Sequence, residues 1–196
     1  MKTATIDNQK YLTPSWEDMG NICFSLAQKI LAQEKSFDRL IALVKGGLTW
    51  SRTLLDYLNI ENLSAFQVKF YNDVYKTQRR PIIVQSLPVV VENETILLFD
   101  DVVDSGETLK IGKDYLLMCG AKKVITASLY YKHWAKIKPD YCVADTSAWI
   151  IFPHEIRETI GLLFKSWRKN KVTVVEIKRR LIKLGLPKEQ IKYYLK

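Results

Sequence analysis

The chain has 196 residues with a net charge of +9, and its composition, 47% hydrophobic and 26% charged, is that of an ordinary globular protein with one substantial core. The longest apolar runs hold only a handful of residues and the N-terminus has no apolar signal-peptide core, which argues against membrane insertion or secretion. Cys23, Cys119 and Cys142 lack metal-ligand spacing and predict buried free thiols in a reducing cytoplasm.

The first half of the chain alternates predicted helices and strands. Thr13-Pro14-Ser15 offers a cap and a helix-starting proline before an amphipathic run over about residues 16–33. The apolar run Leu40–Val44 is typical of a strand buried on both faces. The spacing then predicts a helix over 48–58 and strands over 65–71 and 82–84.

The same alternation continues into the second half. A strand is predicted over Ile96–Phe99, a helix over residues 107–119 with Gly120 after its end, and a strand over 124–131. Two β-turn-α-β units in succession predict an α/β fold, with a central, mainly parallel β-sheet flanked by helices. Ligands of such sheets bind beyond the carboxyl ends of the strands.

The C-terminal part differs in pattern and charge. After Pro153 the spacing predicts three helices, over 154–169, 174–184 and 187–196, and no strand. Residues 155–196 carry twelve Lys or Arg and four acids, a net charge of +8, which leaves +1 for the rest. We therefore expect a main domain over 1–153 and a basic helical extension over 154–196.

The strongest functional signal follows the strand at 96–99 and runs Asp100-Asp101-Val102-Val103-Asp104-Ser105-Gly106-Glu107-Thr108. A hydroxyl, small residues and a helix N-terminus make a socket for a phosphate dianion, and paired carboxylates bind sugar hydroxyls or a divalent metal. A capping turn would not explain the first two acids. Val103 occupies a ligand position of an EF-hand loop, and no Gly-Lys-Ser/Thr of a P-loop follows. The segment predicts a phosphosugar site.

This order of residues resembles the signature of the type I phosphoribosyltransferases, which bind 5-phosphoribosyl-1-pyrophosphate (PRPP). The resemblance implies that Asp100 and Asp101 hold the ribose hydroxyls, directly or through Mg²⁺. It places Asp104 near purine N7 as a general base. The residues that would enclose the 5-phosphate are Asp104, Ser105, Gly106, Glu107 and Thr108.

A second stretch, Lys45-Gly46-Gly47, follows the strand at 40–44 and resembles the pyrophosphate-binding loop of purine phosphoribosyltransferases. Glycines let the backbone approach an anion, and the cation at position 45 adds charge. Both stretches follow strands of one sheet, so we expect a single shared site. The resemblance leaves open whether the Lys45–Gly46 peptide is cis, and Lys69 is a further candidate pyrophosphate contact.

The segments 129–134 and 148–155 resemble the xanthine-guanine and hypoxanthine group of this family, including its archaeal members. The resemblance implies that Lys132 donates to the purine 6-oxygen, that Trp149 stacks on the base and that backbone at Ile150 contacts the ring edge. Core packing for Trp149 and an exposed strand-end cation for Lys132 are the alternatives. His154 stands where the family commonly has an aromatic residue.

The resemblance implies a purine-salvage enzyme, most simply for hypoxanthine, guanine or xanthine, that forms a nucleoside monophosphate and pyrophosphate. Adenine stays an alternative base, because His154 and the extension could reshape the pocket. A PRPP-sensing, nucleic-acid-binding regulator is an alternative of another class, since Lys178-Arg179-Arg180 suits a phosphate backbone, although solubility explains a Lys-rich surface more simply. The extension could also serve assembly or act as a lid. We further expect a homodimer or higher homo-oligomer. For the polar, basic residues 72–85 the resemblance implies a lid that closes on the site, and a solvated loop is the alternative that the sequence leaves open.

Overall fold

The computed structural model describes residues 1–33, 36–72 and 79–195. The chain divides into two compact units, one of Met1–Met19 with Ser147–Lys196 and one of Gly20–Thr146. Helix α1 (Trp16–Leu31) begins in the first unit and continues into the second. No helix within these described ranges combines the length and apolar content that crossing a membrane requires.

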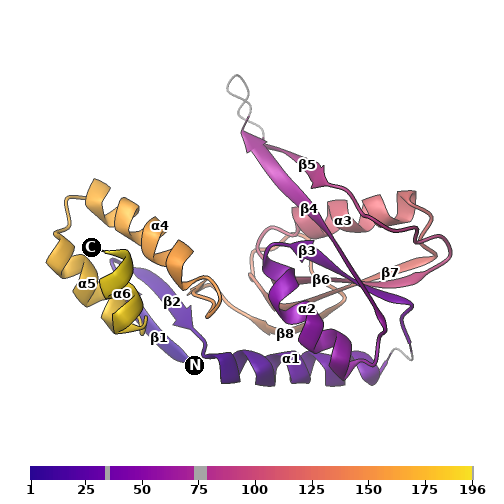
Figure 1. The fold of residues 1–196 in the computed structure, drawn as a ribbon, viewed down its shortest axis with the longest axis horizontal. Coiled ribbons are helices and arrows are strands. Elements are labelled where there is room, and N and C mark those ends of the chain that lie inside the picture. Colours follow the sequence, from indigo (N-terminus) through magenta and orange to yellow (C-terminus); the bar gives the residue numbers. More distant parts are fainter. Residues whose placement is uncertain (34–35, 73–78, 196) are drawn as a thin grey trace. The chain divides into compact units, whose positions relative to one another are not determined.

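The larger unit contains a six-stranded sheet in the order β5-β4-β3-β6-β7-β8, as predicted mainly parallel, with only β5 antiparallel (Figure 1). Its strands are β3 (Arg39–Val44), β4 (Asn62–Asn72), β5 (Arg79–Gln85), β6 (Thr95–Val103), β7 (Lys123–Tyr131) and β8 (Tyr141–Asp145). β8 extends the predicted set by one short edge strand.

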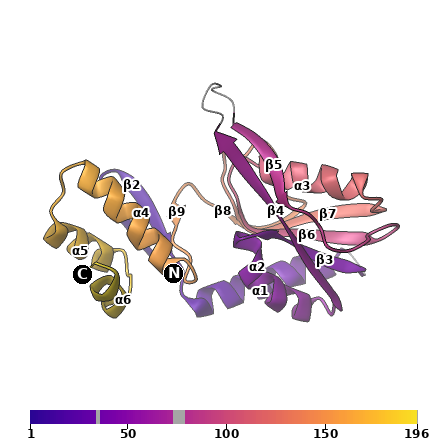
Figure 2. The same cartoon turned by 45° about the horizontal axis from the view of Figure 1, so that its top comes forward.

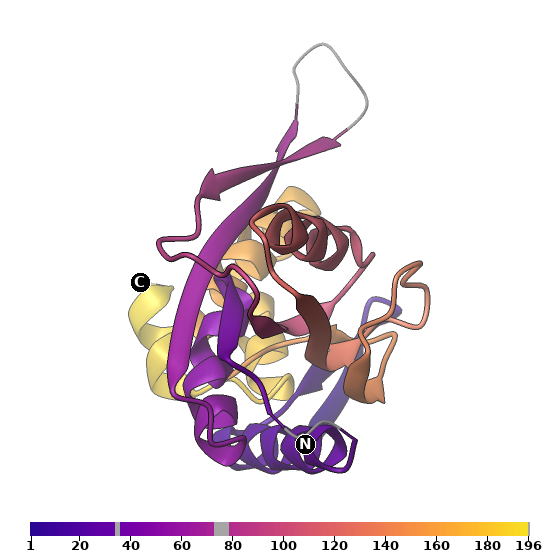
Figure 3. The ribbon, with the colours of Figure 1, turned by 90° about the vertical axis from the view of Figure 1, so that its right-hand side faces the viewer.

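Helices cover both faces of this sheet. α2 (Gly46–Tyr57) lies on one face with the C-terminal part of α1, and α3 (Glu107–Met118) lies on the other (Figures 1 and 3). The runs Leu40–Leu43 and Ile96–Phe99 are at most 1% exposed. Successive side chains of a strand point to opposite faces, so a continuous apolar run is what a sheet covered on both sides requires.

The order of the strands places a topological switch point between β3 and β6. From β3 the chain crosses through α2 to β4 on one side, and from β6 it crosses through α3 to β7 on the other. The carboxyl ends of β3 and β6 therefore lie side by side while their connections diverge. Such a crevice is the usual ligand site of an open α/β sheet.

The smaller unit joins the N-terminal hairpin to the C-terminal helices. β1 (Lys2–Ile6) and β2 (Gln9–Thr13) form an antiparallel hairpin, and its two turn residues, Asp7 and Asn8, both have a left-handed backbone conformation. β9 (Trp149–Ile150) pairs parallel with β2. The three predicted helices are present as α4 (Ile156–Lys169), α5 (Val174–Lys183) and α6 (Lys188–Tyr194) (Figure 2).

These helices and the hairpin share one hydrophobic core, which the sequence did not predict. Ile6, Tyr11 and Ile151 are buried in the same cluster as Leu163, Trp167, Ile177, Leu181, Leu184 and Ile191. The hairpin is mostly polar and short, so its strand pattern is weak until the helices supply a face to bury against. The boundary expected at residue 153 stays a prediction about domains.

Local signals mostly agree with the expectation. Ser15 caps α1, because its Oγ accepts the Asp18 N–H at 3.0 Å and Asp18 Oδ2 accepts the Ser15 N–H at 2.9 Å; the cap therefore follows Pro14. The three cysteines are free, but Cys119 is exposed, so the expected burial was wrong there. Burial raises the pKa of the Cys23 thiol to about 12.

Gly112 gives a test of how closely α3 packs on the sheet. A Cβ at this position would lie 3.1 Å from Leu98 Cδ2, 3.2 Å from Phe66 Cζ and 3.3 Å from Leu43 Cδ2. We predict that Gly112→Leu lowers the free energy of unfolding by about 1–3 kcal/mol, because the buried neighbours must shift. Urea unfolding measures the change.

The matched control is Gly161→Leu in α4, where nothing lies within 4 Å of a new Cβ. There the free energy of unfolding should stay level or rise by roughly 0.5–1 kcal/mol, since glycine is unfavourable inside a helix. Equal losses from the two substitutions would contradict the packing argument.

Candidate active site

The acidic pair lies in the last part of β6, which runs to Val103 and not only to Phe99. Asp101 is 4% exposed and Asp100 is partly buried. Asp100 Oδ1 accepts the N–H of Asp101 at 3.0 Å, and Asp101 Oδ1 accepts the N–H of Val102 at 2.8 Å. Both carboxylates are thus held by the backbone of the strand that carries them.

The glycine turn packs directly on this pair. A Cβ at Gly46 would collide with the Asp101 carboxylate, and one at Gly47 would lie 2.5 Å from the Phe99 carbonyl oxygen. The backbone N–H of Gly47 instead donates to the Asp100 carboxylate. The two stretches that the sequence placed at one sheet edge are therefore in contact, as expected.

Burial and the neighbouring charge of Asp101 raise the pKa of Asp100 well above its usual range, although the N–H bonds from Asp101 and Gly47 oppose the shift. Two close carboxylates in a partly buried position bind a proton or a cation in preference to both being ionised and unpaired. Carboxylate oxygens are also the ligands that Mg²⁺ prefers. The donor set therefore fits a divalent cation.

The turn after β6 lines a cavity of about 390 Å³. Its walls are Phe70, Asp100, Val102, Val103, Asp104, Ser105, Gly106, Glu107, Thr108 and Leu109. All five residues predicted for the 5-phosphate are among them. Phe70 was not predicted, and its only signal in the sequence is its place at the end of a strand.

The turn has the geometry of an anion socket. Gly106 has a φ of +88°, and any Cβ there would collide with the carbonyl oxygen of Ile137. Ser105 Oγ accepts the N–H of Glu107 at 3.2 Å, and α3 begins at Glu107. The N–H groups of the first helical turn and the helix dipole therefore face the cavity, and both favour an anion.

A second segment, residues 132–137, closes over this turn. The Lys132 N–H donates to the Val103 carbonyl at 2.8 Å, and the Lys136 N–H donates to the Ser105 carbonyl at 3.1 Å. The side chain of Lys132 is buried; its burial lowers the pKa of the ammonium, and the nearby charge of Asp104 opposes this. The structure thus brings Lys132 to the acidic turn.

The other predicted binding residues, Lys45, Lys69, Trp149 and Ile150, are not among the described residues that line this cavity. Lys45 precedes α2 and is exposed, and the cis peptide recorded in the described chain is Val44–Lys45, one bond before the position left open. Lys69 is exposed on β4, one residue before Phe70, so its side chain is directed to the opposite face. Its pyrophosphate contact stays a prediction.

Trp149 and Ile150 form β9 in the smaller unit, 50% and 8% exposed respectively. The half-exposed indole departs from the core-packing alternative for Trp149, and the purine contact itself stays a prediction. Residues 73–78, in the middle of the proposed lid, lie outside the described residues.

The sheet is mainly parallel, and a glycine turn and an acidic turn with the geometry of a phosphate site lie at its switch point. These features define an α/β protein that binds phosphorylated small molecules. Residues 15–158 match the phosphoribosyl transferase domain. The chain belongs to the phosphoribosyltransferase family, and its sheet and flanking helices are those of the type I fold.

Individual relatives agree with this assignment. The chain is 27% identical over 145 residues to a xanthine-guanine phosphoribosyltransferase of Gluconobacter oxydans (strain 621H), covering 73% of this chain and 83% of that protein. A xanthine-guanine phosphoribosyltransferase of Idiomarina loihiensis is 28% identical over 145 residues, covering 72% and 85%. The crystal structure of a purine phosphoribosyltransferase from Pyrococcus horikoshii has a TM-score of 0.66 at 30% identity, covering 73% and 93%.

The raised pKa of Asp100 predicts a pH-dependent stability of the free protein. A carboxyl that binds its proton more tightly when folded stabilises the fold below its ordinary pKa of about 4, and this stability is lost as the pH rises through the raised value. In EDTA we expect Asp100→Asn to melt above the native protein at pH 8, with the difference closing towards pH 4. Thermal unfolding across this range measures it.

The exposed Asp56 on α2 supplies the control. Asp56→Asn should change the melting temperature little at either pH, because an exposed carboxyl loses little solvation on folding. A melting temperature of Asp100→Asn below the native one at pH 8 would contradict the assignment of burial and repulsion to this site.

Proposed function

We propose that the protein transfers the 5-phosphoribosyl group of PRPP to a purine base, which gives a nucleoside monophosphate and pyrophosphate. The observation that carries this proposal is the packing of the Gly46-Gly47 turn on Asp100 and Asp101, beside the phosphate-type cavity. Its relatives act on xanthine and guanine by name, so a 6-oxopurine is the proposed acceptor.

In this proposal the turn from Asp104 to Thr108 encloses the 5-phosphate. The left-handed Gly106 and the start of α3 direct backbone N–H groups at the anion, while Ser105 and Thr108 add hydroxyls. Glu107 is exposed and must keep its carboxylate away from the phosphate.

Asp100 and Asp101 would hold the ribose hydroxyls and Mg²⁺. Magnesium, when bound with PRPP, neutralises charge on the leaving pyrophosphate. The carboxylates themselves place negative charge where cationic character develops on the ribose in the transition state. Their partial burial strengthens that interaction, because it removes competing water.

The leaving pyrophosphate would lie on the Lys45-Gly46-Gly47 turn. Gly46 and Gly47 admit the anion to the backbone at the start of α2, and Lys45 supplies an exposed cation. Lys69 is the second proposed cation. Closure of residues 72–85 over the site belongs to the same proposal and would exclude water from the reactive sugar.

For the base, Asp104 would accept the proton at purine N7 and Lys132 would donate to the 6-oxygen. The two residues are adjacent in the larger unit, where Asp104 lines the cavity and its charge favours the ammonium of Lys132. The half-exposed indole of Trp149 would stack on the base, with backbone of Ile150 at the ring edge.

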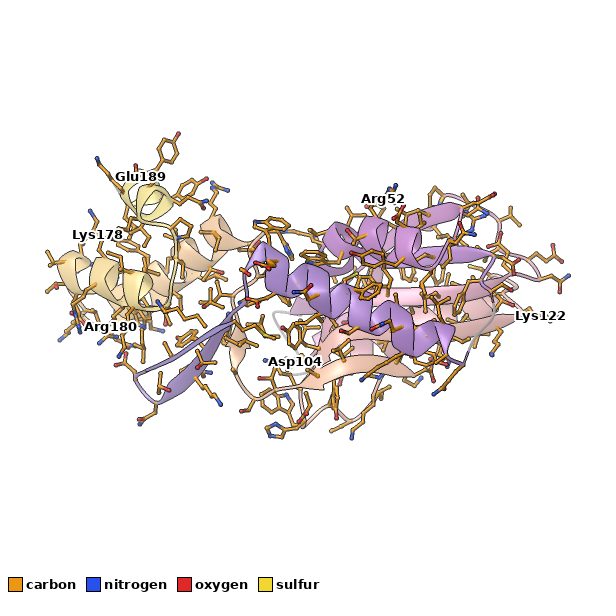
Figure 4. All side chains as sticks on the ribbon, turned by 90° about the horizontal axis from the view of Figure 1, so that it is seen from below. Arg52, Asp104, Lys122, Lys178, Arg180 and Glu189 are labelled. Atoms are coloured by element: carbon orange, nitrogen blue, oxygen red, sulfur yellow. The ribbon has the colours of Figure 1, made fainter. Side chains whose placement is uncertain are left out.

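We assign the extension over 154–196 a structural role beside the transferase domain over 1–153. Two of the three cations in the cluster Lys178-Arg179-Arg180 are ion-paired. Glu176 accepts hydrogen bonds from Arg179 at 2.6 Å and from Arg180 at 3.0 Å, and Arg180 also donates to Asp7. Lys178 and Arg180 are labelled in Figure 4. These pairs leave less charge for a nucleic acid. A homo-oligomer and a cytoplasmic location stay predictions.

The phosphate socket is tested by a pair of glycines that are both left-handed. Gly106→Ala and Gly120→Ala, with φ of +88° and +93°, pay the same backbone cost of about 1–2 kcal/mol. Only the first adds a clash, with Ile137 packed against the turn that lines the cavity; a Cβ at Gly120 comes no closer than 3.5 Å to Glu92. We predict that Gly106→Ala raises the KM for PRPP at least tenfold and that Gly120→Ala leaves it near the native value. Similar KM values for both variants would place the phosphate elsewhere.

The acceptor is tested by steady-state kinetics with PRPP, Mg²⁺ and each of hypoxanthine, guanine, xanthine and adenine. We predict transfer to 6-oxopurines. Lys132→Met keeps the apolar stem and should lower kcat/KM for them about 10- to 100-fold, the equivalent of one charge-assisted hydrogen bond of about 1.5–3 kcal/mol.

Lys136→Met, an exposed residue of the same segment, should have little effect. Transfer confined to adenine would reject the 6-oxopurine assignment while keeping the transferase, and transfer to none of the four bases would reject the proposed function.

A further inference from the structure

Trp134 ends the segment 129–134 that carries the family resemblance, but neither the resemblance nor the predicted site assigns it a role. It lies two residues after Lys132, in the segment that closes over the phosphate-type turn, and its side chain is 51% exposed. An exposed indole contributes little to core packing, so burial alone does not account for a tryptophan here.

The indole is bound to the acidic turn by its one polar group. Trp134 Nε1–H donates to Asp104 Oδ1 over 3.0 Å. An indole has a single donor and no acceptor, so this bond uses its whole hydrogen-bonding capacity. Bonds to a charged acceptor are stronger than neutral ones, and this one restricts the direction in which the carboxylate points.

The backbone around Trp134 makes the arrangement rigid. The Ala135 N–H donates to the Lys132 carbonyl at 2.8 Å and closes a tight turn. The Lys132 N–H at its start donates to the Val103 carbonyl, and the Lys136 N–H directly after it donates to the Ser105 carbonyl. Ile137 fills the space over Gly106, with its Cβ 2.6 Å from where a Cβ of that glycine would lie. Trp134 is therefore presented to Asp104 from a segment anchored on the same turn.

The ring also contacts the second polar group of the base site. Lys132 Nζ lies 5.6 Å from the centroid of the Trp134 ring, within the range of a cation–π interaction. The His133 ring approaches the indole edge-on, with centroids 4.9 Å apart and planes at 78°. One side chain thus touches both the carboxylate and the ammonium.

We propose that Trp134 is a positioning residue of the transfer reaction, which orients Asp104 through its indole N–H and steadies the ammonium of Lys132 with its ring. The inference rests on the proposed function, because it takes Asp104 and Lys132 as the groups that meet the purine. Trp134 itself need not touch the substrate. It fixes the spacing of one acceptor and one donor, and that spacing distinguishes a 6-oxopurine with a proton at N7 from other bases.

The test uses Trp134→Phe, which keeps an aromatic face and removes the N–H donor together with the pyrrole ring that carries it. We expect kcat/KM for the purine to fall about tenfold, as for the loss of one partly exposed charge-assisted hydrogen bond, with the KM for PRPP unchanged. Tyr57→Phe is the control, since it removes one polar hydrogen from an exposed aromatic residue on α2, and it should behave as the native enzyme.

A double-mutant cycle separates positioning from a general structural effect. If Trp134 acts through Asp104, then Trp134→Phe should cost little further activity in an Asp104→Ala background, which has no acceptor for the indole N–H. An equal loss in both backgrounds, or a rise in the KM for PRPP matching the loss for the purine, would overturn the proposal. So would native kinetics of Trp134→Phe.

A measurement on the free protein distinguishes the inference from the proposed function. In ¹⁵N-labelled protein the indole Nε1–H resonance that disappears in Trp134→Phe belongs to Trp134. We expect it to move in Asp104→Ala, which removes the acceptor, and an unmoved resonance would show that the bond is absent and overturn the inference. If the unmutated protein has no transferase activity, the proposed function is overturned. If the unmutated protein is active and Trp134→Phe has the same kinetics, only the role of Trp134 is overturned.

Discussion

The first two residues of α2 lie so close to the end of β6 that neither has room for a side chain. A Cβ at Gly46 or Gly47 would meet Asp101 or the backbone of Phe99. This close approach lets the Gly47 N–H bind the Asp100 carboxylate and brings the glycine turn, the acidic pair and the phosphate-type turn to one edge. The arrangement of the site therefore depends on the absence of a Cβ at Gly46 and at Gly47.

The same packing buries charged groups of the site partly, before any ligand of opposite charge is bound. Asp100 and Asp101 are close together, and Lys132 is buried beside Asp104. Burial raises the pKa of Asp100 and lowers that of Lys132, which favours the neutral form of each, so the free protein holds an electrostatic cost that a cationic ligand and a polar base would relieve. In a protein of this family that cost is useful, since it makes the site selective for charge of the right sign.

The net charge of the basic extension does not by itself show what the extension binds. Its net charge left a nucleic-acid surface open as an alternative to a merely solubilising one, whereas Glu176 and Asp7 accept hydrogen bonds from the arginines at the centre of the cluster. The bond to Arg179 leads the causes that lower the pKa of Glu176 to about 2. Arg180 also lies over the Trp167 ring, 5.4 Å from its centroid. Arg180 thereby joins α5 to the N-terminal hairpin, so this cation contributes to the fold of the smaller unit.

The sequence alone determined the elements and chemistry that depend on neighbours along the chain. Apolar runs such as Leu40–Val44 and the turn from Asp100 to Thr108 carry local signals strong enough to predict buried strands, helix starts and a phosphosugar site. Only the tertiary structure decided which distant groups meet. Trp134 on Asp104 and the hairpin against the C-terminal helices are contacts between remote segments, made through packing. No spacing along the chain encodes such contacts, because their energy arises only once the sheet has formed.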